Sequence, residues 1–408
     1  MRPLLVLLHR WCGLFIALFL FVAGLTGALI SWDHELDEWL NPDLFEARSS
    51  GLAQAPLALA DALEASDPRL RVSWLPLAAE PGHALGLSID PRVDPATGKA
   101  FELGFNQVAL DPVSGAVQGS RQWGEISLSR ENLLPFLYKL HYSLHIPDGF
   151  GLELGVLLFG VVAIVWCFDC LVALWLSFPS RRAWRKSLAF RWRRGGYQLN
   201  FDLHRSGGVW VWALLLVLAV TSVSMNLNVQ VMRPLVELFS PLSPSPFASR
   251  TPVTLDEQRE PALGRVEILQ RAAVEAARLG LDLPAGGIFH SAEYDLYGVG
   301  FFTLENEHGD GGLGNPWLYL DAQDGRVLGA QIPGSGSAGD VFMQAQFPLH
   351  SGRILGLPGR ILVSFMGLMV AMLSLTGIVI WLKKRAARRQ AALATRMPEV
   401  PARGLSQG

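Results

Sequence analysis

Cysteine is scarce in this sequence and lies only in apolar surroundings. Among 408 residues there are three, Cys12, Cys167 and Cys170, each within or beside an apolar run. Disulfide bonds are therefore not expected in any exposed domain, and such domains must be stabilised by their own apolar cores. Cys167 and Cys170 form a C-x-x-C pair, which we interpret as helix-packing residues because it falls within an apolar segment.

The sequence also lacks an excess of charge of one sign and a nucleotide-binding motif. Its formal net charge is -2, and the basic residues cluster beside apolar runs. A broad surface that could neutralise phosphates is therefore absent, so nucleic acid is not expected as a partner. Neither the basic segment 179–203 nor the tail 383–408 has the strand, glycine-rich turn and helix of a dinucleotide site.

Long apolar runs are abundant. Half of the residues are hydrophobic and the mean hydropathy is +0.29, which is typical of a membrane protein. Four segments, 11–32, 152–178, 209–228 and 361–382, have the roughly 20 apolar residues needed to cross the hydrocarbon. The first is too long for the apolar core of a signal peptide, and no A-x-A-like cleavage site follows it, so we expect it to be retained.

Charged residues beside these segments indicate the orientation. Lysine and arginine in short loops near a span stay in the cytoplasm. The segment 179–203 and the start of the tail 383–408 are basic, whereas acidic residues follow the first span. We therefore expect both termini in the cytoplasm of a bacterium, four spans in its inner membrane, and segments 33–150 and 229–360 in the periplasm. The basic residues concerned are Arg181, Arg182, Arg185, Lys186, Arg191, Arg193, Arg194, Lys383, Lys384, Arg385, Arg388 and Arg389.

The two halves of the chain repeat the same landmarks. The tripeptide Leu-His-Arg opens the first span at His9 and the third at His204, and each histidine is followed four residues later by glycine on the same helix face. Leu-His recurs at His145 and His350, just before the second and fourth spans, again with glycine at equal spacing. The halves therefore supply two related pairs of histidines.

The segments between the spans have the pattern of small folded domains. Residues 57–65 and 266–279 have helical apolar spacing, and residues 70–75 and 297–304 alternate as strands do. Segments 108–117 and 318–327, each with aspartate and glycine at the turn, predict hairpins. Segments 240–252 and 307–316 are interpreted as linkers. The expected fold class is an α-helical membrane protein, a four-helix bundle (1–32, 151–178, 204–228 and 361–382) with two small α+β domains (33–150 and 229–360).

The histidine pattern predicts haem. His9 and His204 are expected at the cytoplasmic face, and His145 and His350 at the outer face. A haem iron is held by two imidazoles on opposite sides of a flat ring, and facing helices of a bundle can present them. We therefore predict two bis-histidine haem b groups, one near each face. Arginines adjacent to three of these histidines are expected to pair with haem propionates; they are Arg10, Arg205 and Arg353.

The outer ligand has an alternative. His141 precedes His145 by four residues, so on a helix the two share a face. The repeat favours His145, because Gln346 stands where the second half would match His141. His141 is kept as the alternative axial ligand or as a ligand of substrate iron.

These polar residues have other interpretations. A single histidine at a helix end could merely lie among lipid headgroups, but four at repeat-related positions favour a site. A metal transport path would need polar groups near the midplane, where the sequence offers few: Thr26, Asp169, Thr221 and Thr376. Asp169 is expected to pair with a cation of the adjacent basic loop.

Several phrases of the sequence resemble the PepSY-associated transmembrane family. They are LHRWCGL and GLTGAL in the first span, the second LHR, FPLHSG before the last span and SLTGIVIW within it. The resemblance covers nearly the whole chain and implies PepSY-type domains outside the membrane. For characterised relatives it implies a haem-containing inner-membrane reductase that releases iron as Fe(II) from ferric siderophore in the periplasm. A soluble reductase, a ferredoxin or a membrane quinol would donate the electrons. The alternatives are a PepSY sensor or protease regulator without enzymatic activity, and a metal permease.

Overall fold

The computed structural model describes residues 1–180, 182, 184–247 and 250–394, and the chain forms two compact units. The first unit comprises Met1–Leu25, Val161–Ala219 and the residues from Met366 on; the second comprises Thr26–Gly160 and Val220–Phe365. Arg181 of the basic loop, residues 248–249 of the linker and residues 395–408 of the tail lie outside the described residues.

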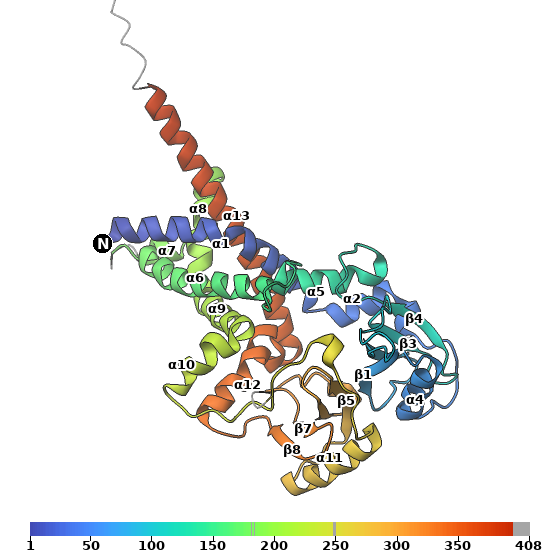
Figure 1. Cartoon of the computed structure of the whole chain (residues 1–408). Helices are drawn as coiled ribbons and strands as arrows, with labels where there is room; N and C mark the ends of the chain where they lie inside the picture. The colour runs from blue at the N-terminus through green and yellow to red at the C-terminus, as the bar shows by residue number, and fades with distance from the viewer. Residues whose placement is uncertain (181, 183, 248–249, 395–408) are drawn as a thin grey trace, which may run out of the picture. The chain divides into compact units, whose positions relative to one another are not determined.

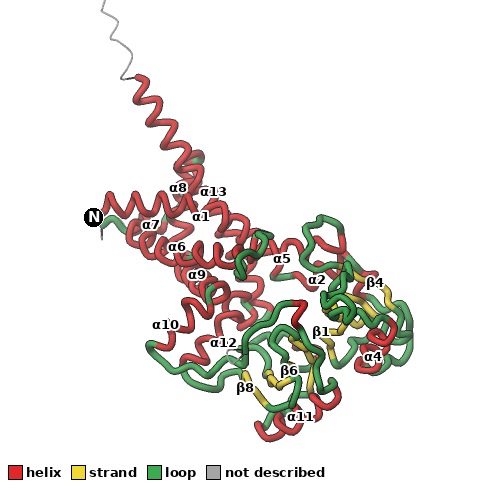
Figure 2. Tube along the Cα trace, viewed as in Figure 1, coloured by secondary structure: helices red, strands yellow, loops and turns green. Residues whose placement is uncertain are grey.

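Helices make up most of the described chain (Figures 1 and 2). They are α1 (Arg2–Ile30), α2 (Asp33–Leu40), α3 (Pro42–Phe45), α4 (Pro56–Ser66), α5 (Leu133–Ser143), α6 (Leu154–Ser177), α7 (Trp184–Leu188), α8 (Gly196–Trp210), α9 (Trp212–Asn226), α10 (Arg233–Glu237), α11 (Arg265–Leu279), α12 (Ala338–Ser351) and α13 (Leu357–Ala394). Short 3-10 turns at Leu304–Asn306 and Arg353–Leu355 matter below.

Three helices of the described chain, α1, α6 and α13, are long and apolar enough to cross a membrane. A fourth span exists if α8 and α9, which are bent by 72° at Val211, are taken together. The predicted third span, 209–228, therefore begins at the end of α8 and continues through α9 across this bend. Ser206, Gly207 and Gly208 come just before the bend, and Gly/Ser pairs are a common cause of sharp helix kinks.

All eight strands of the described chain belong to one antiparallel sheet with the order β4-β3-β2-β1-β5-β6-β7-β8. The strands are β1 (Leu70–Pro76), β2 (Leu85–Pro91), β3 (Gln107–Leu110), β4 (Val117–Arg121), β5 (Ala285–Ser291), β6 (Leu296–Phe301), β7 (Trp317–Asp321) and β8 (Val327–Gln331). Each sequence half contributes four neighbouring strands, and β1 and β5 join the halves, as Figure 1 shows. The two expected α+β domains therefore share one continuous sheet. Pairing β1 with β5 removes two exposed sheet edges.

A single apolar core runs across both halves of this sheet. Leu59 and Leu63 of α4 belong to it, as do Ile268 and Ala272 of α11, together with alternate residues of the strands. These helices confirm the predicted helical segments 57–65 and 266–279. Since side chains alternate between the two faces of a strand, α4 and α11 cover one face, and the residues between the core positions face the other way.

Both predicted hairpins are confirmed. Strand β3 pairs with β4, and β7 pairs with β8. The carboxylate of Asp111 accepts hydrogen bonds from the backbone N–H groups of Val113 and Ser114, and Gly115 has a φ of 76°. In the second half, Asp321 and Gly325 form the same turn. Aspartate and glycine are needed here because the turn requires a local acceptor and a left-handed residue.

Candidate functional site

The first unit brings His9 of α1 together with His204 of α8. Their ring centroids are 6.1 Å apart, and the ring planes are inclined by 45°. The Nδ1 atom of His9 is 2.8 Å from Oδ1 of Asp169 on α6. The Nδ1–H group of His204 donates to the carbonyl oxygen of Leu373 at 3.0 Å, and Oγ1 of Thr376 lies 3.1 Å from the same nitrogen. This is the first histidine pair.

The second unit brings His141 of α5 together with His350 of α12, and we call these the second histidine pair. The ring centroids are 6.2 Å apart with the planes inclined by 56°. Thr26 of α1 is hydrogen-bonded to Nδ1 of His141 at 3.1 Å, and Thr221 of α9 is hydrogen-bonded to Nδ1 of His350 at 3.0 Å. Both pairs therefore have the same construction.

All four imidazoles use Nδ1 in a hydrogen bond, and a histidine oriented in this way binds a metal through Nε2. A metal–nitrogen bond of about 2.0 Å and a ring radius of about 1.1 Å put the centroids of two imidazoles on opposite sides of one ion roughly 6.2 Å apart. The observed separations are 6.1 and 6.2 Å. The donor set and the ring spacing of both pairs therefore fit bis-histidine haem.

The triplet Leu-Thr-Gly supports one histidine of each pair. On α1, Thr26 bonds His141, and a Cβ atom added to Gly27 would lie 2.9 Å from Cε1 of that ring. On α13, Thr376 bonds His204, and a Cβ atom added to Gly377 would lie 3.0 Å from Cε1 of that ring. Threonine thus orients the imidazole, and glycine lets the ring approach the helix.

This close approach gives a testable prediction. Gly377→Ala should push the ring of His204 away from α13, because the added methyl group would be closer than nine in ten real Cβ contacts. We expect about tenfold weaker binding of haem at the first pair, as is usual when ligand positioning is disturbed. Haem retention on dilution of the purified protein measures this. Gly312→Ala, where an added Cβ meets no atom within 4 Å, is the matched control, and equal retention by both variants would contradict the prediction.

The preference for His145 as partner of His350 is wrong. Helix α5 ends at Ser143, and both Leu144 (φ 53°) and His145 (φ 54°) are in the left-handed region. The chain changes direction at these two residues, and the ring of His145 stacks on the ring of Phe136 with the centroids 4.7 Å apart. The Nε2–H group of His145 donates to the carbonyl oxygen of Phe136 at 2.9 Å. Helix α12, in contrast, continues to Ser351, so His350 stays on its helix.

Two of the three predicted arginines, Arg205 and Arg353, have protein partners. Arg205 lies 3.9 Å from Asp202 and over the ring of Phe201. Arg353 forms an ion pair with Asp310 at 2.8 Å. Arg10 is half-buried on α1, one residue after His9. The assignment of these three arginines to haem propionates stays a prediction.

Sequence reasoning missed the groups that orient the histidines. Asp169 was expected to pair with a basic loop residue, but it bonds His9. Thr26 and Thr221 were considered only as groups on a transport path. The internal repeat identifies both threonines, because each lies 17 residues after the histidine of a Leu-His-Arg tripeptide. Thr26 follows His9 at this spacing, and Thr221 follows His204.

The fold and the histidine pairs define a helical membrane protein in which a duplicated helix-and-sheet plan carries two pairs of neighbouring histidines. The chain belongs to the family described as the PepSY-associated TM region, whose model matches residues 6–384. The comparison with curated proteins finds no match.

Proposed function

We propose that this protein carries two bis-histidine haem b groups and transfers electrons across the bacterial inner membrane to a ferric chelate in the periplasm. The observation that carries the proposal is the pair of ring separations, 6.1 Å for His9 and His204 and 6.2 Å for His141 and His350. Bound haem would supply one-electron exchange between Fe(III) and Fe(II), and two haems would divide roughly 30 Å of hydrocarbon into shorter steps.

Three side chains and one backbone carbonyl group of the protein orient the four imidazole rings. Asp169, Thr26 and Thr221 hold the Nδ1 atoms of three histidines, and the carbonyl oxygen of Leu373 holds the fourth. Such partners fix the ring orientation and raise the basicity of the ligand nitrogen. The apolar helices around the rings exclude water and keep the local dielectric constant low.

The chemistry of iron explains why reduction is useful. An oxygen-donor chelator such as a siderophore binds the small, highly charged Fe(III) ion much more tightly than Fe(II). One electron therefore loosens the complex and leaves the chelator intact. The proposed enzyme is thus a ferric-chelate reductase for iron acquisition.

The electron donor would act at the cytoplasmic face. In the proposed orientation both termini and the basic segment 179–203 are cytoplasmic, since basic flanks stay on that side. Exposed Arg185 and Arg193 of this segment are suited to an acidic reductase or ferredoxin. A membrane quinol is the second possible donor.

The proposal is tested by the haem content of the purified full-length protein. We expect a red preparation with two haems per chain in a pyridine haemochrome assay, and absorption bands that change on reduction with dithionite. Addition of a ferric chelate to the reduced protein should return the oxidised spectrum. A colourless protein from cells supplied with haem would overturn the proposal and favour a PepSY-type sensor or protease regulator. Metal uptake independent of redox state would favour a permease.

A further inference from the structure

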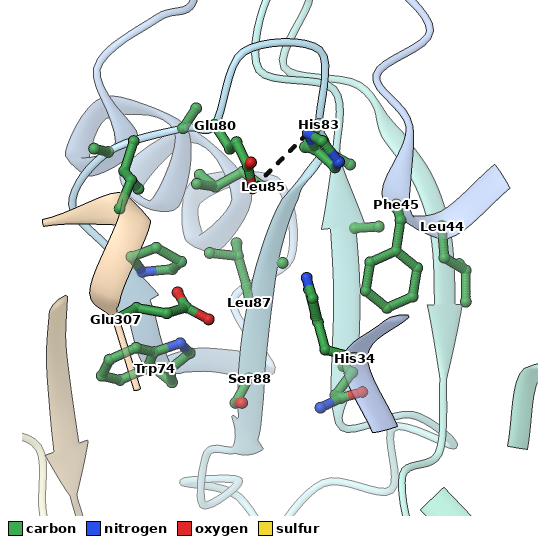
Figure 3. A pocket seen from close by; sticks show the side chains of 18 of the residues that line it. His34, Leu44, Phe45, Trp74, Glu80, His83, Leu85, Leu87, Ser88 and Glu307 are labelled. Atoms are coloured by element: carbon green, nitrogen blue, oxygen red, sulfur yellow. Dashed lines mark ion pairs between the residues drawn. The ribbon is translucent and has the colours of Figure 1, made fainter. Parts of the chain in front are cut away.

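The second unit contains a cavity of about 620 Å³ on the sheet face that is turned away from α4 and α11. Leu85, Leu87 and Ile89 of β2 face the core, so Gly86 and Ser88 between them form the cavity floor. Figure 3 shows Glu307 near Trp74 on one side of β2 and His34 near Phe45 on the other. The cavity is therefore built from α2, α3, the four strands of the first half and the loop that contains Glu307.

Aromatic rings lie on the sheet at the related position of the second half. Glycines of β6 lie under aromatic rings there: a Cβ atom added to Gly298 would be 2.2 Å from the ring of Phe289, and one added to Gly300 would be 2.8 Å from the ring of Trp317. A Cβ atom added to Gly86 meets nothing within 4 Å. The same fold is thus packed with aromatic side chains in one half and left open in the other.

Both walls of the cavity connect directly to the second histidine pair. His34 belongs to α2, which follows α1 after a two-residue turn, and α1 provides the Thr26 that bonds His141. On the other wall, Asp310 forms the ion pair with Arg353, and Arg353 also accepts a backbone hydrogen bond from Gly311 at 2.8 Å. Arg353 opens the 3-10 turn that follows α12, three residues after His350. Both walls of the cavity are therefore joined to elements that carry the second pair.

The charge of the lining selects the ligand. Four carboxylates line the cavity: Glu80, Glu305, Glu307 and Asp310. Arg121 provides the one guanidinium of the described lining, and it is paired with the buried Asp37 at 2.7 Å. Burial, with the charge of Arg353, lowers the pKa of His308 to about 4, so this histidine adds no charge at neutral pH. Asp310 is paired with Arg353, and the hydrogen bond to Glu38 raises the pKa of His83, which lies 3.9 Å from Glu80. The remaining negative charge of the lining comes from Glu305 and Glu307, and it repels an anionic ligand.

We propose that this cavity is the binding site of the ferric chelate, and that it accepts chelates of zero or positive net charge and rejects anionic ones. The inference rests on the proposed function for the identity of the ligand as a chelate. Three hydroxamate groups, each with one negative charge, give a neutral complex with a trivalent ion, and an added ammonium group makes it cationic. Three catecholates, each with two negative charges, give a complex of charge minus three, which the carboxylates repel.

Gallium(III) chelates test this site independently of electron transfer, because Ga(III) has the charge and size of Fe(III) but is not reduced. Binding to the full-length protein in detergent is measured by calorimetry with a gallium tris-hydroxamate and a gallium tris-catecholate. We expect saturable binding of the tris-hydroxamate and at least about tenfold weaker binding of the tris-catecholate.

Variants locate the site. Gly86→Leu fills the cavity from its floor and should abolish binding, whereas Ala330→Leu, at an exposed strand position outside the cavity, should not change it. Glu307→Gln should weaken binding of a cationic hydroxamate several-fold more than binding of a neutral one.

Unchanged affinity in Gly86→Leu, tighter binding of the catecholate, or no binding of either probe would each overturn the proposal. If the protein contains two haems but these binding results are not obtained, only the proposed chelate site is contradicted and the proposed function stands. A colourless protein that binds the gallium probe would contradict the proposed function and support the chelate site.

Discussion

Replacing His141 by alanine is expected to remove one of two haems, whereas replacing His145 by alanine should leave both. His141 is the residue that lies 6.2 Å from His350, centroid to centroid, while His145 is stacked on Phe136 and bonded to its carbonyl oxygen. An iron that loses one of two imidazole ligands loses most of its affinity for the site. The pyridine haemochrome assay on equal amounts of folded protein measures the effect.

The first pair supplies the counterpart of this experiment. His204→Ala should also reduce the haem content from two to one, and the double variant with His141→Ala should contain none. His145→Phe, which keeps an aromatic ring against Phe136, is the control for damage to the turn after α5. Two haems in His141→Ala, or one haem in both His145→Ala and His145→Phe, would contradict the assignment of the second pair.

Asp169→Asn is expected to raise the reduction potential of one haem and leave the other unchanged. The carboxylate of Asp169 is 2.8 Å from Nδ1 of His9, whereas the other three histidines are held by neutral oxygens. A carboxylate partner makes the imidazole more basic and stabilises Fe(III) relative to Fe(II). A tenfold change in that preference corresponds to about 60 mV for one electron, which is the size of shift we expect.

Potentiometric titration of the haem absorption bands measures this shift. Asparagine keeps an oxygen acceptor for the Nδ1–H group, so the change isolates the charge. Thr376→Val is the matched control at the first pair, because the carbonyl oxygen of Leu373 still accepts from His204 and only a small shift is expected. Equal potentials in the wild type and Asp169→Asn, with both haems bound, would show that the carboxylate does not tune the iron.

Local patterns in the sequence were sufficient to predict much of this fold. Apolar length predicted α1, α6 and α13, and apolar periodicity predicted α4 and α11. Aspartate and glycine at fixed spacing predicted both hairpins. These features succeed because each depends on residues within a few positions of one another in the chain.

The features that were not predicted depend on distant contacts or on single backbone angles. Pairing of β1 with β5 joins residues about 200 positions apart, and no local pattern encodes it. The repeat placed His145 opposite His350 because it assumed helices of equal length, but Leu144 and His145 adopt left-handed angles and end α5 early. Measured from the observed helix ends, His141 and His350 are at similar positions. His141 precedes the cap residue Leu144 by three positions, and His350 precedes the cap residue Gly352 by two.

The sheet and the histidine pairs share one rule of construction. Each pair takes one ring from each half of the chain, and the sheet takes four strands from each half. A half-length polypeptide could therefore complete neither of the histidine pairs nor the sheet unless two identical copies associated about a twofold axis. Joining the two copies in one polypeptide allows their sequences to differ. One histidine of a pair can then contact a carboxylate where the other contacts only neutral oxygens, and one half of the sheet can be open where the other is packed with aromatic rings.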